Sequence, residues 1–66
     1  MFRIKRQHWD DRTAWVAKDG KYTGVKEEAE IFRSEVSAIR ARDALRAAWQ
    51  AETDEPVAFS LERVPE

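Results

Sequence analysis

Polar and apolar residues alternate near both ends of the chain, whereas apolar residues recur at three- and four-residue steps in the middle. From Phe2 to Trp9 the period is two, which is typical of a half-buried strand and turns Phe2 and Ile4 toward a core. A short polar stretch separates this segment from a second segment rich in β-branched and aromatic residues, so the two segments are predicted to form a β-hairpin. The same alternation returns after Pro56. The pattern predicts strands over residues 2–9, 13–18 and 57–64.

The central part of the chain has helical spacing, but its apolar residues change face near Ser34. One continuous helix would carry two apolar faces and expose one of them in so short a chain. Alternatively, Ser34 is the N-cap, accepting a backbone N–H from the first turn, where the helix dipole favours Glu35. We favour this second interpretation because the cap accounts for both the serine and the change of face. The predicted helix then spans residues 35–51, and Phe32 fills the core from an extended approach. Its expected apolar arc contains Ala38, Ala41, Ala44, Leu45, Ala48 and Trp49.

Between the second strand and the helix the pattern is weaker. Asp19 and Gly20 form a turn dipeptide that ends the strand, and Gly24 disfavours regular structure. We expect an irregular connection here, with a short helical turn near residues 26–30. The predicted fold is therefore α+β, with ββαβ order and one helix on one face of a three-stranded antiparallel sheet. The expected strand order is 2-1-3, which places Arg3 and Lys5 near Glu62 on the outer face.

Length and composition limit the architecture to a single small domain. Of the 66 residues, 42% are apolar, but ten of these are alanine, so the three Trp, three Phe and one Tyr must supply much of the core. There is no cysteine, and hence no disulfide or thiolate site. No apolar run is long enough for a membrane span or a signal peptide, so we expect a cytoplasmic protein without membrane contact.

The net charge of −1 hides an uneven distribution. Residues 1–26 contain seven Lys or Arg and three Asp, a balance of +4, and residues 27–66 contain five Arg and ten Asp or Glu, a balance of −5. Such a chain can be stabilised by packing of its own halves, or it can present a charged face to a partner.

One segment resembles small phage- and prophage-encoded proteins of unknown function. The shared layout is an aromatic strand, an Asp-Gly turn, Tyr-Thr, and then A-x-x-F-x-S-x-x-x-A leading into a helix. The matching residues are Trp15, Asp19, Gly20, Tyr22, Thr23, Ala29, Phe32, Ser34 and Ala38. They cover about a third of the chain and occupy turn, core, cap and helix-face positions. The resemblance implies a compact ββαβ domain of phage or prophage origin and carries over no catalytic residue.

Catalytic motifs are missing from the sequence. His8 is the only histidine and has no partner spacing typical of a metal site or a catalytic dyad. Phosphate-binding glycine loops and H-E-x-x-H are also absent. We therefore expect no enzymatic activity, no metal and no cofactor.

Two candidate binding surfaces remain. The outer side of the helix combines apolar and basic residues suited to self-association as a homodimer or to binding a host protein: Val36, Ile39, Arg42 and Arg46. The first strand and its loop carry basic residues interleaved with an aromatic one, which could contact nucleic acid: Arg3, Lys5, Trp9 and Arg12. The sequence predicts a non-enzymatic protein-interaction module that binds itself or a host protein, or alternatively a nucleic-acid-associated accessory protein.

Overall fold

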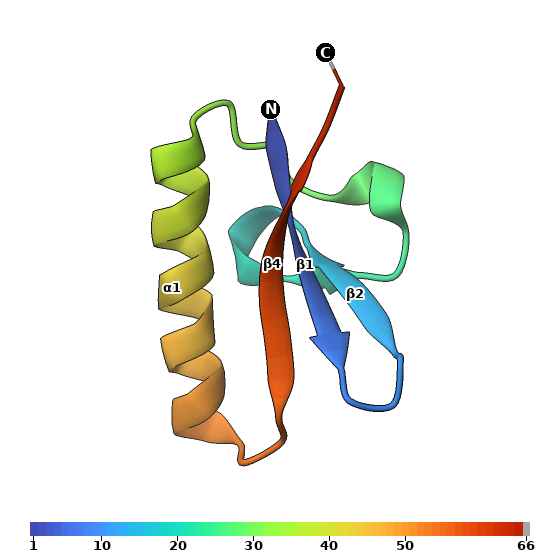
Figure 1. Ribbon diagram of the computed structural model, residues 1–66, viewed down its shortest axis with the longest axis vertical. Coiled ribbons are helices and arrows are strands. Elements are labelled where there is room, and N and C mark those ends of the chain that lie inside the picture. Colours follow the sequence, from blue (N-terminus) through green and yellow to red (C-terminus); the bar gives the residue numbers. More distant parts are fainter. Residues whose placement is uncertain (66) are drawn as a thin grey trace.

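The computed structural model describes residues 1–65 and is an α+β fold with one helix against one face of an antiparallel sheet (Figure 1). The strands are β1 (Phe2–His8), β2 (Thr13–Val16), β3 (Tyr22–Thr23) and β4 (Val57–Arg63), and the helix is α1 (Glu35–Glu52). The sheet order is β3-β2-β1-β4. The chain thus returns from α1 into β4 beside the first strand, so the predicted neighbours of the first strand are confirmed.

The sheet has four strands, and the prediction of three was wrong. Asp19 and Gly20 do not merely end β2. They adopt consecutive left-handed φ angles of 63° and 74°, which reverse the chain within a tight turn. The Ala17 N–H then donates to the Lys21 carbonyl at 2.7 Å, and Tyr22 pairs with Val16. The expected helical turn after Gly24 is present as a 3-10 turn at Lys26–Glu28.

α1 begins where the capping interpretation placed it. Ser34 has an extended backbone, and its Oγ accepts the Ser37 N–H at 3.4 Å. The preceding segment is extended, because Phe32 exchanges two backbone hydrogen bonds with Phe2, at 2.7 and 2.8 Å. The interpretation of two elements joined at Ser34 is therefore confirmed.

The packed face of α1 is narrower than predicted. Ala38 is fully buried, and Ala41, Leu45 and Trp49 pack against the core, but Ala44 and Ala48 are exposed. The helix lies on the sheet through a single stripe of positions spaced by three and four residues, and Ala44 is turned about 105° and Ala48 about 65° away from its centre. Their assignment to the apolar arc was wrong.

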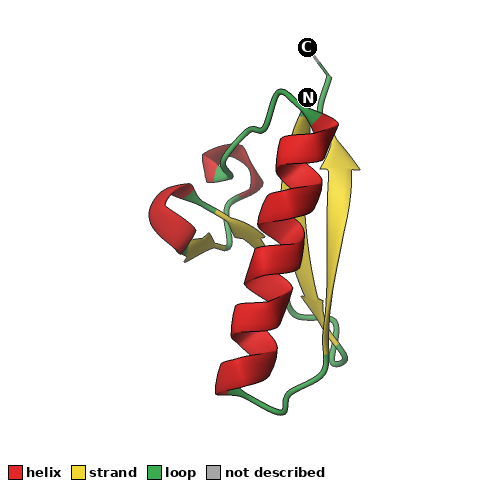
Figure 2. Ribbon diagram, turned by 90° about the vertical axis from the view of Figure 1, so that its left-hand side faces the viewer, coloured by secondary structure: helices red, strands yellow, loops and turns green. Residues whose placement is uncertain are grey.

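The core lies between α1 and the inner face of the sheet (Figure 2). Ile4, Val16 and Phe59, one from each of three strands, are its buried centre. Partly buried residues surround them: Tyr22, Phe32, Ala41, Leu45, Trp49, Val57 and Leu61. With so few large buried side chains, each contact of α1 with the sheet matters to stability.

Loss of the cap should destabilise the protein measurably. We expect Ser34→Ala to lower the free energy of unfolding by about 1 kcal/mol, because the first turn of α1 loses its side-chain acceptor. Urea unfolding followed by circular dichroism measures this change. Ser37→Ala is the matched control, since only its backbone N–H takes part in the cap. An equal loss in both variants would contradict a capping role for Ser34.

Candidate interaction surface

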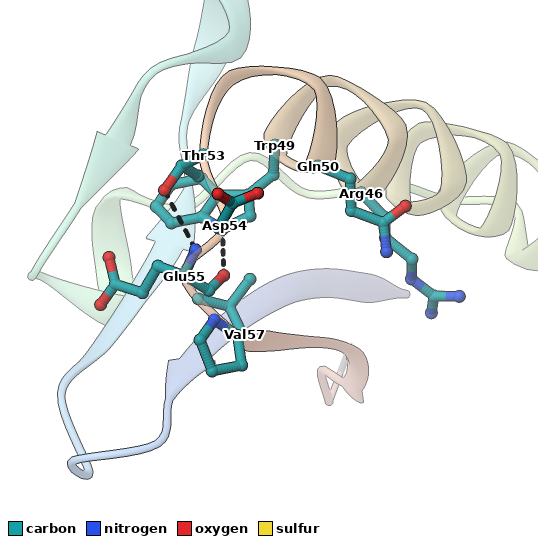
Figure 3. Close-up of a pocket in the computed structure, with 8 residues that line it drawn as sticks. Arg46, Trp49, Gln50, Thr53, Asp54, Glu55 and Val57 are labelled. Atoms are coloured by element: carbon teal, nitrogen blue, oxygen red, sulfur yellow. Dashed lines mark hydrogen bonds between the residues drawn. The ribbon is translucent and has the colours of Figure 1, made fainter.

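The side of α1 that faces the free edge of β4 is the most distinctive surface of the fold. α1 runs down beside β4 and is joined to its start by a short loop (Figure 1). Arg46 and Gln50 line a hollow of about 410 Å³ together with Pro56 and Val57 at the beginning of β4 (Figure 3). Ile39 lies seven residues before Arg46, two helical turns away on the same side. This side of α1, bearing Ile39, Arg42, Arg46 and Gln50, is called the β4-side flank below.

Three of the four predicted partner-binding residues belong to the β4-side flank. Ile39 and Arg42 are partly buried and Arg46 is exposed. The Arg42 Nε donates to Asp43 Oδ1 at 3.2 Å, so this cation is already paired within its own helix. Val36 lies further round on the outer side of α1 and is 57% exposed. Val36 and the β4-side flank together therefore offer an apolar pair, Val36 and Ile39, bordered by arginines.

The loop that borders the hollow is hydrogen-bonded to the end of α1 and within itself. The Trp49 Nε1 donates to the Glu55 carbonyl at 2.9 Å, and the Glu55 N–H donates to Thr53 Oγ1 at 3.1 Å (Figure 3). These bonds satisfy backbone groups between the end of α1 and Pro56. The hollow therefore borders a loop whose backbone is hydrogen-bonded to the side chains of Trp49 and Thr53.

The outer face of the sheet carries a paired charge cluster. Glu62 accepts hydrogen bonds from the Arg3 Nε at 2.7 Å and the Trp15 Nε1 at 2.8 Å, and the Lys5 Nζ lies 4.0 Å from its second oxygen. Partial burial acts to raise the pKa of Glu62, but the hydrogen bonds from Arg3 and Trp15 and the charges of Arg3 and Lys5 outweigh it, so the pKa is lowered. The predicted proximity of Arg3 and Lys5 to Glu62 is confirmed.

The residues predicted for a nucleic-acid face differ in their surroundings. Arg3 and Lys5 lie together on the outer sheet face, and Trp9, which follows the end of β1 and is 73% exposed, lines a hollow with Ala58 of that face. Arg12 turns toward the α1–β4 loop, with its guanidinium 2.7 Å from Asp10 and 2.8 Å from Glu55. The hydrogen bond from Arg12 lowers the pKa of Asp10, and Asp10 in turn raises the pKa of Arg12.

Sequence reasoning missed a polar and aromatic cluster under the C-terminal half of α1. The guanidinium of Arg6 lies 4.1 Å from the ring centroid of Tyr22 and 4.7 Å from that of Trp49. His8 is buried, with its Nδ1 2.8 Å from Glu55 Oε1 and its ring edge-on to Trp49. The signal was present, because Arg6 and His8 fall on the apolar parity of the first strand. An arginine there needs a partner that parity alone cannot identify.

Arg6 is unusual because its charge has aromatic partners but no acidic partner among residues 1–65. Its Nε is buried and makes no hydrogen bond among residues 1–65. Two rings over one guanidinium provide cation–π attraction that offsets part of this desolvation. The cluster joins β1, β3 and α1, and its role is to hold these elements together.

The described residues contain neither a metal-binding cluster nor a membrane-spanning helix, and comparison with known proteins identifies no relative. Within residues 1–65, no three His, Cys, Asp or Glu side chains are grouped so that they could hold a metal ion. Over the same range, no helix has the length and apolarity needed to cross a membrane. The chain matches no family model, no curated protein and no solved structure. The resemblance to phage-encoded proteins therefore stays a prediction.

The charge cluster on Glu62 should make stability depend on pH. A carboxyl whose folded pKa lies below its ordinary 4.5 stabilises the fold above that pH, and this contribution is lost as the pH falls through the folded pKa. We expect Glu62→Gln to lower the free energy of unfolding by about 1 kcal/mol at neutral pH. The difference from wild type should shrink in acid, as measured by urea unfolding over a pH series. A difference that stays constant down to the acid limb would contradict the ion-pair explanation.

Proposed function

We propose that this chain is a non-enzymatic protein-interaction module that binds itself or a host protein through the outer side of α1. The binding surface consists of Val36 and the β4-side flank. The observation that carries this proposal is the position of an exposed apolar residue, Val36, beside partly buried Ile39 on the side of α1 that borders an edge strand. Apolar residues ringed by arginine are typical of protein interfaces.

The chemistry of the remaining polar groups supports a binding role over a catalytic one. The single histidine is buried between Glu55 and Trp49, so its ring serves packing and a hydrogen bond. The carboxylates of Glu55 and Glu62 are each engaged by arginine. A catalytic acid or base would have to be presented to a substrate.

Ion pairing also favours a protein partner over nucleic acid. Arg3 and Lys5 together face one carboxylate, Glu62, which leaves a surplus of a single positive charge in that cluster. Arg12 is bound by two carboxylates. Affinity for a phosphate backbone rises with the number of free cations that can displace counterions, so this arrangement supplies little of it.

Site-specific photocrosslinking tests the proposal directly. A photoreactive amino acid replacing Val36 should form a discrete protein adduct in native cells, because this position lies in the proposed interface. The same amino acid replacing Ala44 is the matched control, since Ala44 is also exposed on α1 but lies away from the β4-side flank. The mass of the adduct distinguishes a second copy of the chain from another protein.

Ile39→Asp in the Val36-labelled chain should abolish the adduct, because it places a charge in the apolar part of the interface. Circular dichroism and urea unfolding of Ile39→Asp show whether α1 remains folded. Absence of any adduct at position 36, or equal adducts at positions 36 and 44, would overturn the proposal.

A further inference from the structure

The two edges of the sheet differ in length and in protection. β3 forms one edge and has only two residues, whereas β4 forms the other and has seven. All seven residues of β4 pair with β1 in one unbroken register, with no bulge. Among the described residues no further strand pairs with the outer side of β4, and Figure 2 shows α1 over the sheet face, not along that edge. Natural edge strands are usually protected by a proline, a bulge, charged side chains or a covering element. β4 has charged side chains only at its C-terminal end, Glu62 and Arg63, and its nearest prolines, Pro56 and Pro65, lie outside the strand.

The backbone groups that point out of this edge can be identified from hydrogen bonds on the other side of β1. Phe2 exchanges both backbone hydrogen bonds with Phe32, and the His8 N–H donates to the Arg12 carbonyl. The backbone groups of Phe2 and His8 therefore point away from β4. Their partners on β4, Arg63 and Val57, are therefore in non-hydrogen-bonded pairs, and the backbone groups of these two residues point away from β1. Because the direction alternates from one residue to the next, every second residue of β4 points outward. The residues with outward N–H and C=O groups are Val57, Phe59, Leu61 and Arg63.

This set of donors and acceptors is complementary to itself. If two copies of β4 run antiparallel about a two-fold axis at Ser60, Val57 meets Arg63 of the second copy and Phe59 meets Leu61. All four outward residues of each copy then lie opposite partners that can exchange hydrogen bonds. A two-fold axis at either neighbouring outward residue, Phe59 or Leu61, leaves one or more of these residues unpaired.

Side-chain charges favour the same register. On the outer face, Ser60 lies opposite Ser60 of the second copy, and Glu62 lies opposite the exposed Ala58. No like charges face each other. A two-fold axis at Glu62 would instead oppose two carboxylates, which is destabilising.

We propose that β4 is a homotypic docking strand and that its occupant is the β4 of a second copy, paired antiparallel about Ser60. The result is a continuous eight-stranded sheet with both α1 helices on one face. This inference rests on the proposed function, which gives a protein as the class of partner, and it names that partner as a second copy of the chain. The two-fold axis turns the β4-side flanks of the two helices toward each other, so the strand edge and Ile39 belong to one interface.

Cysteine crosslinking tests the register, since the chain contains no cysteine. Ser60→Cys should oxidise to a covalent dimer, because opposed residues of a non-hydrogen-bonded pair bring their Cα atoms about 4.5 Å apart, within disulfide range. Ala58→Cys is the matched control. It is equally exposed, but it lies opposite Glu62, and the two copies of residue 58 are about 14 Å apart along the strand. Ala58→Cys should therefore remain reduced.

Charge substitutions test the same pairing at equilibrium. Ser60→Lys and Ser60→Glu should each weaken self-association about fivefold in sedimentation equilibrium, because they oppose like charges at the two-fold axis. An equimolar mixture of the two should associate again. Thr13→Lys, exposed on the outer face of β2 but away from the edge, should have no effect. Thermal unfolding of each variant shows whether the monomer fold is intact.

A wild type that remains monomeric at millimolar concentration overturns this inference, as does Ala58→Cys crosslinking as fast as Ser60→Cys. Self-association that is lost in Ile39→Asp but unchanged in the Ser60 variants would place the interface on the helix flank alone. That result overturns strand pairing and leaves the proposed function standing. A monomeric chain whose position 36 crosslinks to a different protein likewise overturns strand pairing and leaves the proposed function standing.

Discussion

One indole ring, that of Trp49, joins the helix to three of the four strands of the sheet. It contacts the rings of His8, Tyr22 and Phe59 edge-on, with centroids 5.7, 6.5 and 6.4 Å away. These three residues come from β1, β3 and β4. The same indole donates to the Glu55 carbonyl at 2.9 Å and so fixes the loop that leads into β4. A core whose buried centre is only Ile4, Val16 and Phe59 depends strongly on such a contact.

Arg6 extends the influence of Trp49 to the edge of the sheet. Its guanidinium contacts both this indole and the ring of Tyr22 in β3. β3 has only two residues and pairs with β2 alone, so this contact gives it a second attachment to the domain. The buried Nε of Arg6 makes no hydrogen bond to residues 1–65, and its desolvation opposes this stabilisation. A domain of this size buries a smaller fraction of its surface than a larger one, and the long Arg6 side chain, with an apolar stem and a stacked head, adds to the cover of its core.

The position of α1 over β1 and β4 also decides which surfaces remain available. The helix covers the inner face near β4 and leaves the edge of that strand open (Figure 2). At the same time, Glu62 and Glu55 engage the basic side chains Arg3, Lys5 and Arg12. Both proposals place binding at the β4 edge and the adjoining flank of α1.

Sequence by itself determined the parts of this protein that depend on near neighbours. Period-two alternation located β1 and β4, and Ser34 with the change of apolar face located the start of α1, because caps and strand parity act over two to four residues. Tertiary structure alone decided the rest. β3 exists because two successive left-handed residues, Asp19 and Gly20, fold Tyr22 back onto Val16. The Arg12 side chain turns toward the α1–β4 loop because its guanidinium donates to the carboxylate of Glu55, 43 positions later, at 2.8 Å. Arg6 acquired its role from two rings distant in sequence, and such partners are fixed only once the chain has closed around Trp49.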